Sequence, residues 1–228
     1  MKYNFLATLL LAVLLLELIL KASPLLGALA YFAAIAAAVA AASKLSYENE
    51  SKKQLILFTA AVCAIKTASL FLSVSLFWRT LAAYALLTFV CVFYASDLNL
   101  PKRQIRYRWI GWAVVATILL GYAGSVVTGL ERDALFLGLI PFIAFSEEYI
   151  FRGLILNSSE KESGKEAAVL FAALFYGVLC LGYGLTAAFF FFTMSLLFGL
   201  IYIYTRRLFL VMIFSAIVHA FLFAMPEL

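Results

Sequence analysis

Apolar residues in this chain run in long unbroken blocks, and this pattern most limits what the chain can fold into. Each block is near the ~20 residues that a helix needs to cross a bilayer, and the apolar positions do not follow amphipathic spacing. Only 13% of the 228 residues are charged, 66% are hydrophobic and the mean hydropathy is +1.07. So little polar surface cannot cover a soluble core. The sequence therefore predicts an all-α fold, a polytopic transmembrane helical bundle.

We count about 8–9 spans in one integral membrane domain, residues 1–228. The first block is read as a retained span because no small-residue cleavage site follows it and a second block starts at once. The connections at 22–23 and 77–78 are short enough for one of these hairpins to be a broken or re-entrant helix. The predicted spans are 4–21, 24–42, 54–76, 79–96, 108–130, 135–156, 167–183, 185–205 and 208–225.

The Lys and Arg residues in the connections support this count. If successive connections alternate between the two sides, one side holds twelve of these residues and the other holds three. The twelve are Lys2, Lys44, Lys52, Lys53, Lys102, Arg103, Arg106, Arg108, Lys161, Lys165, Arg206 and Arg207, and the three are Lys21, Arg79 and Arg132. The positive-inside rule places the N-terminus in the cytoplasm and the C-terminus outside. The net charge of +5 follows from this bias, so we predict no nucleic-acid partner.

Two spans near the N-terminus contain ionisable residues, which are costly inside a membrane. Glu17 and Lys21 are four residues apart, and this spacing predicts a local ion pair near the outer interface. Lys66 lies near the middle of its span and is expected to pair with a carboxylate elsewhere, in either a structural or a functional role.

The sixth span carries the strongest chemical signal. Glu147 and Glu148 are adjacent, and Arg152 follows four residues after the second carboxylate, on the same helical face. Arginine can hold Glu148 ionised while Glu147, about 100° around the helix, is poised for proton transfer. Pro141 removes a helical hydrogen bond just before the pair and can admit water. The structural alternative is a charge cluster that joins helices.

His219 and Cys180 are predicted to reach the same depth as this carboxylate pair. From the span boundaries, Glu147 is about 18 Å from the outer end of its helix, while His219 and Cys180 are about 17 and 20 Å from the inner ends of theirs. All three levels fall near the middle of a core ~30 Å thick. The alternatives are that His219 makes a hydrogen bond between helices and that Cys180 is an ordinary small packing residue.

At these residues the sequence resembles the CPBP intramembrane protease family, which includes the type II CAAX prenyl endopeptidases and the bacterial Abi proteins. The family motif Glu-Glu-x-x-x-Arg is matched in full by Glu147-Glu148-Tyr149-Ile150-Phe151-Arg152. The second and third motifs are altered. Cys180 stands where the family has a histidine, and Phe223 stands where an asparagine follows His219. The resemblance covers roughly residues 135–225, the predicted protease-like core, and leaves 1–130 as accessory spans.

The resemblance implies that Glu147 activates a water, that Glu148 and Arg152 support it, and that His219 stabilises the oxyanion. Cys180 would donate weakly or act as a nucleophile beside His219. The cofactor is either none or a zinc ion, which would be held by Glu147, Cys180 and His219. Glutamic, metal-dependent and thiol mechanisms all stay open.

Three functions fit these features. The first is an intramembrane endopeptidase of the CAAX type that cleaves a membrane-tethered or lipid-anchored protein, or its C-terminal anchor, with the bilayer and that protein or peptide as partners. The second is an inactive scaffold of the same fold or a peptide-toxin immunity protein, which the altered motifs favour. The third is a small transporter with Glu147 and Glu148 as a proton relay, although no repeated hydrophobic pattern supports it.

Overall fold

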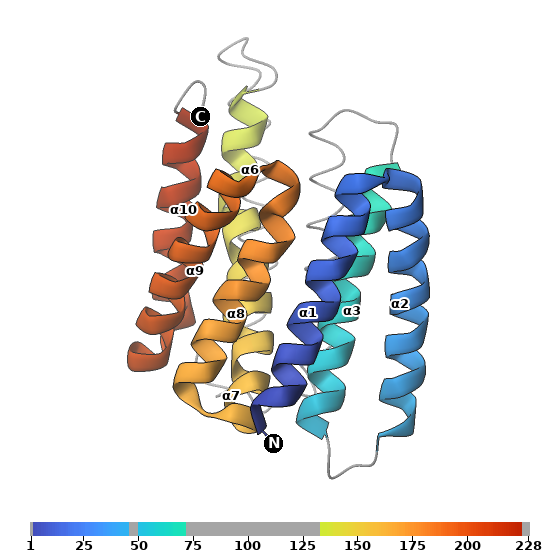
Figure 1. Ribbon diagram of the computed structural model, residues 1–228. Helices are drawn as coiled ribbons and strands as arrows, with labels where there is room; N and C mark the ends of the chain where they lie inside the picture. Colours follow the sequence, from blue (N-terminus) through green and yellow to red (C-terminus); the bar gives the residue numbers. More distant parts are fainter. Residues whose placement is uncertain (1, 46–49, 72–132, 225–228) are drawn as a thin grey trace. The chain divides into compact units, whose positions relative to one another are not determined.

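The computed structural model describes residues 2–45, 50–71 and 133–224, and every regular element in these ranges is a helix. This confirms the predicted all-α bundle. Residues 2–45, 50–71 and 150–206 belong to one compact unit, the first unit, and residues 133–149 with 207–224 belong to the second unit. The elements in chain order are α1 (Lys2–Ala22), α2 (Pro24–Lys44), α3 (Glu50–Phe71), α6 (Asp133–Glu148), the π-helix η2 (Tyr149–Leu156), α7 (Asn157–Ser163), α8 (Lys165–Leu179), the 3₁₀-helix η3 (Cys180–Tyr183), α9 (Leu185–Thr205) and α10 (Leu208–Ala224) (Figure 1).

Four stretches in the described ranges are long and apolar enough to cross a membrane, and α10 contains a shorter apolar stretch, Leu208–Ala220. The four are Asn4–Ala22, Pro24–Lys44, Lys165–Tyr183 and Leu185–Thr205, each close to a predicted span. The predicted spans 79–96 and 108–130 lie outside the described residues. An integral membrane helical protein is thus confirmed, while the count of 8–9 spans stays a prediction.

The first two helices form a tight hairpin. Ser23 is extended and Pro24 occupies the first turn of α2, where proline has no hydrogen bond to lose. A Cβ atom added at Gly27 would lie 2.2 Å from the Cα atom of Leu20, so only glycine permits this approach. Two complete helices, rather than one broken helix, therefore flank the short connection at 22–23.

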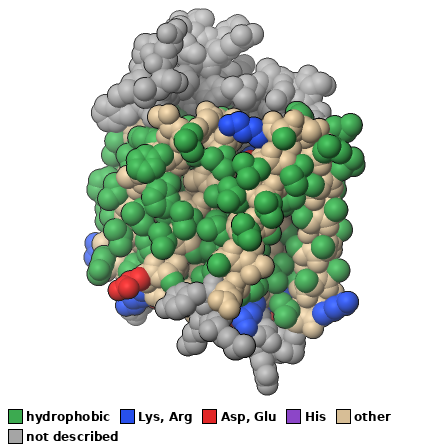
Figure 2. Space-filling model, viewed as in Figure 1, with side chains coloured by type: hydrophobic (Ala, Val, Ile, Leu, Met, Phe, Trp, Pro, Cys, Tyr) green, Lys and Arg blue, Asp and Glu red, His purple; other side chains and the backbone are tan. Residues whose placement is uncertain are grey.

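Within the first unit, α8 packs against α9 and α1, and α1 to α3 contact one another in sequence order (Figure 1). Small residues on α8 are buried, whereas many large apolar side chains on α1 and α2 point outward. The outward group includes Leu11, Leu15, Leu25, Leu29 and Phe32. Figure 2 shows hydrophobic side chains over most of the visible face, with Lys and Arg side chains near helix ends. Such a surface is stable in lipid and not in water.

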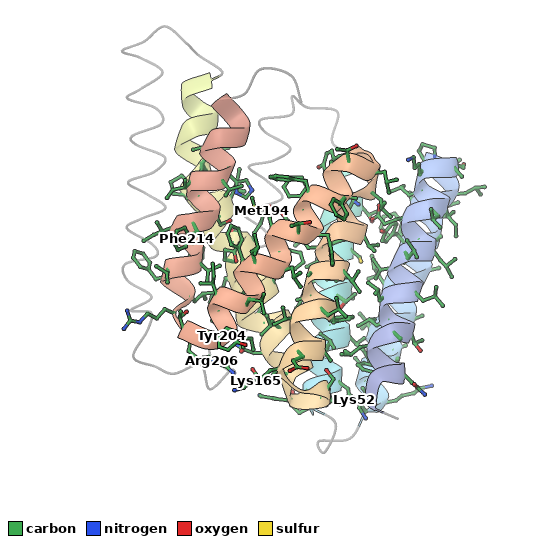
Figure 3. The ribbon with its side chains drawn as sticks, turned by 60° about the vertical axis from the view of Figure 1, so that its left-hand side comes forward. Lys52, Lys165, Met194, Tyr204, Arg206 and Phe214 are labelled. Atoms are coloured by element: carbon green, nitrogen blue, oxygen red, sulfur yellow. The ribbon has the colours of Figure 1, made fainter. Side chains whose placement is uncertain are left out.

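Basic side chains mark one end of the first unit. Figure 3 shows Lys52, Lys165 and Arg206 toward this end. Lys52 at the start of α3 lies 3.9 Å from Glu162 of α7, and Arg206 after α9 binds Glu160 of α7 at 2.5 Å. The hydrogen bond to Glu160 raises the pKa of Arg206 above its ordinary range. The start of α3 and the end of α9 are thus both tied to α7 by ion pairs.

The predicted ion pair between Glu17 and Lys21 is wrong. Glu17 is buried and its carboxylate binds the Nζ atom of Lys66 at 2.5 Å. Lys21 is exposed at the end of α1 and has no ion pair among the described residues. The carboxylate of Glu17 faces Lys66 of α3, and this ion pair replaces the local one. The predicted carboxylate partner of Lys66 is confirmed and is Glu17.

Candidate active site

The second unit brings Glu147 and His219 together. Helices α6 and α10 lie side by side (Figures 1 and 3), and the Oε2 atom of Glu147 is 3.3 Å from the Nε2 atom of His219. The side chain of Glu147 is 10% exposed and that of His219 is 20% exposed. The two residues are 72 positions apart in the sequence. They were predicted to lie at the same depth in the membrane, and in the structure their side chains are in direct contact.

A backbone carbonyl fixes the proton arrangement of His219. The Nδ1 atom lies 2.8 Å from the carbonyl oxygen of Ser215, one helical turn earlier. A carbonyl can only accept a hydrogen bond, so Nδ1 carries a proton. The Nε2 atom then faces Glu147 either as an acceptor or, in the imidazolium, as a second donor. The pair can therefore hold or release one proton between a carboxylate and an imidazole, which is what general acid–base chemistry requires.

The helix changes its geometry directly after the two carboxylates. Helix α6 continues through Pro141 and ends at Glu148, and the π-helix η2 begins at Tyr149. Ser146 donates a hydrogen bond to the carbonyl of Phe142 at 2.9 Å, one turn before the change. π-Helical turns are rare and occur often at functional sites. The change of winding resets the directions of the side chains that follow Glu148, and the periodicity of the sequence did not predict it.

Arg152 is buried in the first unit and is held by α9. Its Nη2 atom donates to the carbonyl oxygen of Ser195 at 3.2 Å and to the Ser195 hydroxyl at 3.1 Å, and its guanidinium lies over the ring of Phe198 at 5.6 Å. A buried charge needs such partners to be tolerated. Glu148 is also buried, in the last turn of α6. The contact between Glu148 and Arg152 that their spacing predicts stays a prediction.

Cys180 marks the point where α8 becomes the 3₁₀-helix η3. It is the C-cap of α8, and its backbone N–H donates to carbonyls of the preceding turn. The side chain is buried, at 6% exposure. Gly184 closes the turn with a φ of 110°, a conformation that favours glycine, before α9 begins. Cys180 lies in the first unit, and its predicted convergence with Glu147 and His219 stays a prediction.

A metal site needs at least three ligands from the protein in a catalytic zinc centre. Among the described residues, no group of three or more His, Cys, Asp and Glu side chains is placed to hold a metal ion. Glu147 and His219 provide two such donors. The zinc ligands predicted from the resemblance stay a prediction, because Cys180 lies in the first unit and the other two residues lie in the second.

Three residues at these sites were missed from the sequence. Ser215 lies four residues before His219, and this spacing could have indicated that its carbonyl accepts from the ring. Ser195, a polar residue within an apolar span, could have been singled out as a partner for a buried charge. Phe198 lies among many phenylalanines, and nothing in the sequence marks it as the ring beneath Arg152.

Comparison with known proteins agrees with the motif. Residues 129–221 match the family model described as Rce1-like, type II CAAX prenyl endopeptidase Rce1-like. A search of curated proteins and a search of solved structures give no match. The matched stretch contains all five predicted site residues and the altered positions of the second motif. The C-terminal part of the chain, residues 129–221, is therefore similar to the Rce1-like family of type II CAAX prenyl endopeptidases.

Proposed function

We propose that this protein is an intramembrane endopeptidase that hydrolyses a peptide bond in a membrane-tethered or lipid-anchored protein. The observation that carries the proposal is the contact between Glu147 and His219, at 3.3 Å between neighbouring apolar helices. A buried carboxylate beside an imidazole whose other nitrogen is already fixed by Ser215 is suited to activating water. The similarity of residues 129–221 to the Rce1-like family model supports this reaction class.

The reaction uses Glu147 as the general base. Its carboxylate takes a proton from a water molecule, and the resulting hydroxide attacks the carbonyl carbon of the scissile bond. The Nε2–H group of His219, in the imidazolium form, donates a hydrogen bond to the oxygen that becomes negative. When the tetrahedral intermediate collapses, the proton held by Glu147 passes to the leaving amine. The proton that Glu147 takes from water is the one that it later gives to the leaving amine, so no other proton donor is needed.

The other predicted site residues have supporting roles in this proposal. Glu148 and Arg152 fix the helix that presents Glu147, and Ser195 holds the guanidinium of Arg152 from α9. Cys180 occupies the position of the second-motif histidine and would donate weakly to the substrate through its thiol. A glutamic mechanism therefore needs no nucleophilic thiol and no metal ion.

The substrate is a segment that the bilayer brings to the enzyme. The family description names prenyl endopeptidases of the CAAX type, so a lipid-modified C-terminal peptide is the first substrate class to test. Removal of a C-terminal membrane anchor is the second. We propose the N-terminus in the cytoplasm and the C-terminus outside, with residues 135–225 as the protease-like core behind the accessory spans of 1–130.

The test is cleavage of membrane-tethered peptides by the purified full chain in lipid bilayers. The panel contains prenylated and unmodified C-terminal peptides and peptides with a transmembrane anchor. Wild type is compared with Glu147→Gln, which keeps the size of the side chain and removes the base. Glu166→Gln is the matched control, because Glu166 is exposed at the start of α8.

We expect cleavage by wild type and by Glu166→Gln, and none above background by Glu147→Gln. Equal rates for wild type and Glu147→Gln would contradict the proposed base. A wild-type protein that is folded yet inert on the whole panel would contradict the peptidase and favour a scaffold of the same fold.

A further inference from the structure

Three accessory helices each contribute one polar side chain to a single buried cluster in the first unit. Glu17 comes from α1, Tyr31 from α2 and Lys66 from α3. The Tyr31 hydroxyl donates to the carboxylate of Glu17, and the Nζ atom of Lys66 donates to the same carboxylate at 2.5 Å. Glu17 and Tyr31 are buried, at 3% and 0% exposure. The cluster thus neutralises a charge inside helices whose outer faces suit lipid.

Lys66 also reaches beyond these three helices. Its Nζ atom donates a second hydrogen bond, at 2.6 Å, to the backbone carbonyl of Leu179, 113 residues away in the sequence. Leu179 is the last residue of α8. The final carbonyls of a helix have no partner within the helix and carry its partial negative charge, so a cation there is stabilising. Lys66 therefore caps α8 from a different helix, with Glu17 holding the ammonium in place.

The capped residue directly precedes Cys180. At Cys180 the winding changes from α8 to the 3₁₀-helix η3, and the direction of its side chain depends on where this change occurs. The bond from Lys66 to Leu179 fixes the last α-helical carbonyl before the change. This cap is thus one residue away from the position at which the second motif of the family is altered.

Packing alone does not require these residues. A charge within a membrane span is costly to insert, and apolar side chains can join helices without this cost. A lysine differs from an apolar residue in that its ammonium has three donors and can bind two acceptors on different helices. Here those acceptors are the carboxylate of Glu17 and the carbonyl of Leu179.

We propose that Lys66, held by Glu17, is a positioning residue that sets the turn carrying Cys180 for catalysis. The bond from Lys66 then connects the accessory helices α1 to α3 to the reaction. The inference rests on the proposed function, because it takes Cys180 to lie beside the substrate. Lys66 itself touches no reacting atom.

The experiment uses Lys66→Met, which keeps the length of the side chain and removes its donors, and Lys66→Arg, which keeps the charge and donors. The control is Lys21→Met, since Lys21 is exposed at the end of α1. All variants are measured as the full chain in bilayers. The readouts are kcat and KM on a peptide that wild type cleaves, hydrogen exchange of the amides of residues 180–184, and the unfolding midpoint.

We expect Lys66→Met to lower kcat by about tenfold to hundredfold with KM changed by less than about twofold, because a small misplacement near a reacting centre costs rate rather than binding. Exchange of residues 180–184 should rise about tenfold while exchange in the middle of α8 is unchanged, since a lost cap opens the helix end first. Lys66→Arg should restore most of kcat, and Lys21→Met should match wild type.

A kcat for Lys66→Met equal to that of wild type would overturn the positioning role and leave the peptidase standing. A uniform rise of exchange across α8, or a fall in kcat that Lys66→Arg does not restore, would make Lys66 only a structural residue. If Lys66→Met does not fold, Lys66→Gln and Lys66→Arg take its place, and failure of both to fold also overturns the proposal. If wild type cleaves nothing, the proposed function fails. A rise in hydrogen exchange confined to residues 180–184 of Lys66→Met would then still show that Lys66 caps the end of α8.

Discussion

Two carboxylates in the described helices each lie against a nitrogen group, and their surroundings differ. Glu17 in the first unit is bound by Lys66 at 2.5 Å and by the hydroxyl of Tyr31, and its side chain is 2% exposed. Glu147 in the second unit lies 3.3 Å from His219, and these side chains are 10% and 20% exposed. The two cations are similarly exposed, at 23% for Lys66 and 20% for His219, whereas the carboxylate of Glu17 is less exposed than that of Glu147 and lies closer to its cation.

This difference indicates which pair reacts. A carboxylate that accepts hydrogen bonds from both an ammonium and a hydroxyl joins the helices that carry these groups. A carboxylate beside an imidazole can exchange a proton, because histidine changes its charge more readily than any other cation. A glutamate paired with a lysine thus serves structure in one unit, and a glutamate paired with a histidine serves, in our proposal, chemistry in the other. The predictions below separate stability from activity, beginning with the largest effect.

Glu147→Gln tests the reactive side of the comparison. We expect kcat/KM to fall by about 10³-fold or more, because a positioned base typically contributes 10²–10⁴-fold. The unfolding midpoint in a denaturing-detergent titration should change little, since the amide keeps the shape of the side chain and its contact with His219. If Glu147→Gln lost much of its stability and kept activity, Glu147 would instead have a structural role like that of Glu17.

Glu17→Gln tests the structural side. Removing one partner of a buried ion pair leaves Lys66 with an unmatched charge and costs about 3 kcal/mol or more of unfolding free energy. The double variant Glu17→Gln with Lys66→Met should lose less than the sum of the single variants, because no unpaired charge remains. Additive losses in the same detergent titration would show that the pair is not coupled.

His219→Gln gives a smaller loss of activity than Glu147→Gln. Removal of one oxyanion donor costs about 10²–10³-fold in kcat, and the glutamine amide can replace part of the hydrogen bond. We expect a loss of about 10²-fold in single-turnover cleavage, with KM nearly unchanged. A rise in KM at constant kcat would assign His219 to substrate binding and not to stabilisation of the oxyanion.

The sequence predicted the chemistry of these sites better than their contacts. The motif Glu147-Glu148-x-x-x-Arg152 inside an apolar block indicated the family, and the depth of His219 predicted that it could meet Glu147. The predicted partner of Glu17 was wrong because residue spacing along one helix cannot show which face of that helix contacts a neighbouring helix. Lys66 was matched to a carboxylate in general, but its bond to the carbonyl of Leu179 depends on how α3 and α8 are placed.

The change to a π-helix after Glu148 could not be predicted from the sequence, for a related reason. Residues Tyr149–Leu156 have an ordinary apolar composition, and nothing in them favours an extra residue per turn. Within this π-helix, Arg152 is bonded to Ser195 of α9, a contact that the sequence of the segment alone does not show. Where tertiary contacts determine the local geometry, residue preferences predict the helix but not its pitch.

A third pair, Arg206 with Glu160, sharpens the comparison because it is much more exposed. The two side chains are 41% and 20% exposed, and such ion pairs contribute about 0–1 kcal/mol. Arg206 also has a φ of 54°, a left-handed conformation that costs a non-glycine residue about 1 kcal/mol. Arg206→Gly loses the ion pair but also removes the backbone strain, so its stability should stay within about 0.5 kcal/mol of wild type. Arg206→Ala loses the ion pair and keeps the strain, so its stability should fall about 1 kcal/mol below that of Arg206→Gly.

Detergent titration of both variants measures the difference. Equal stabilities would mean that the backbone after α9 relaxes when Arg206 is removed, whereas a loss as large as that of Glu17→Gln would show that burial does not govern the strength of these pairs.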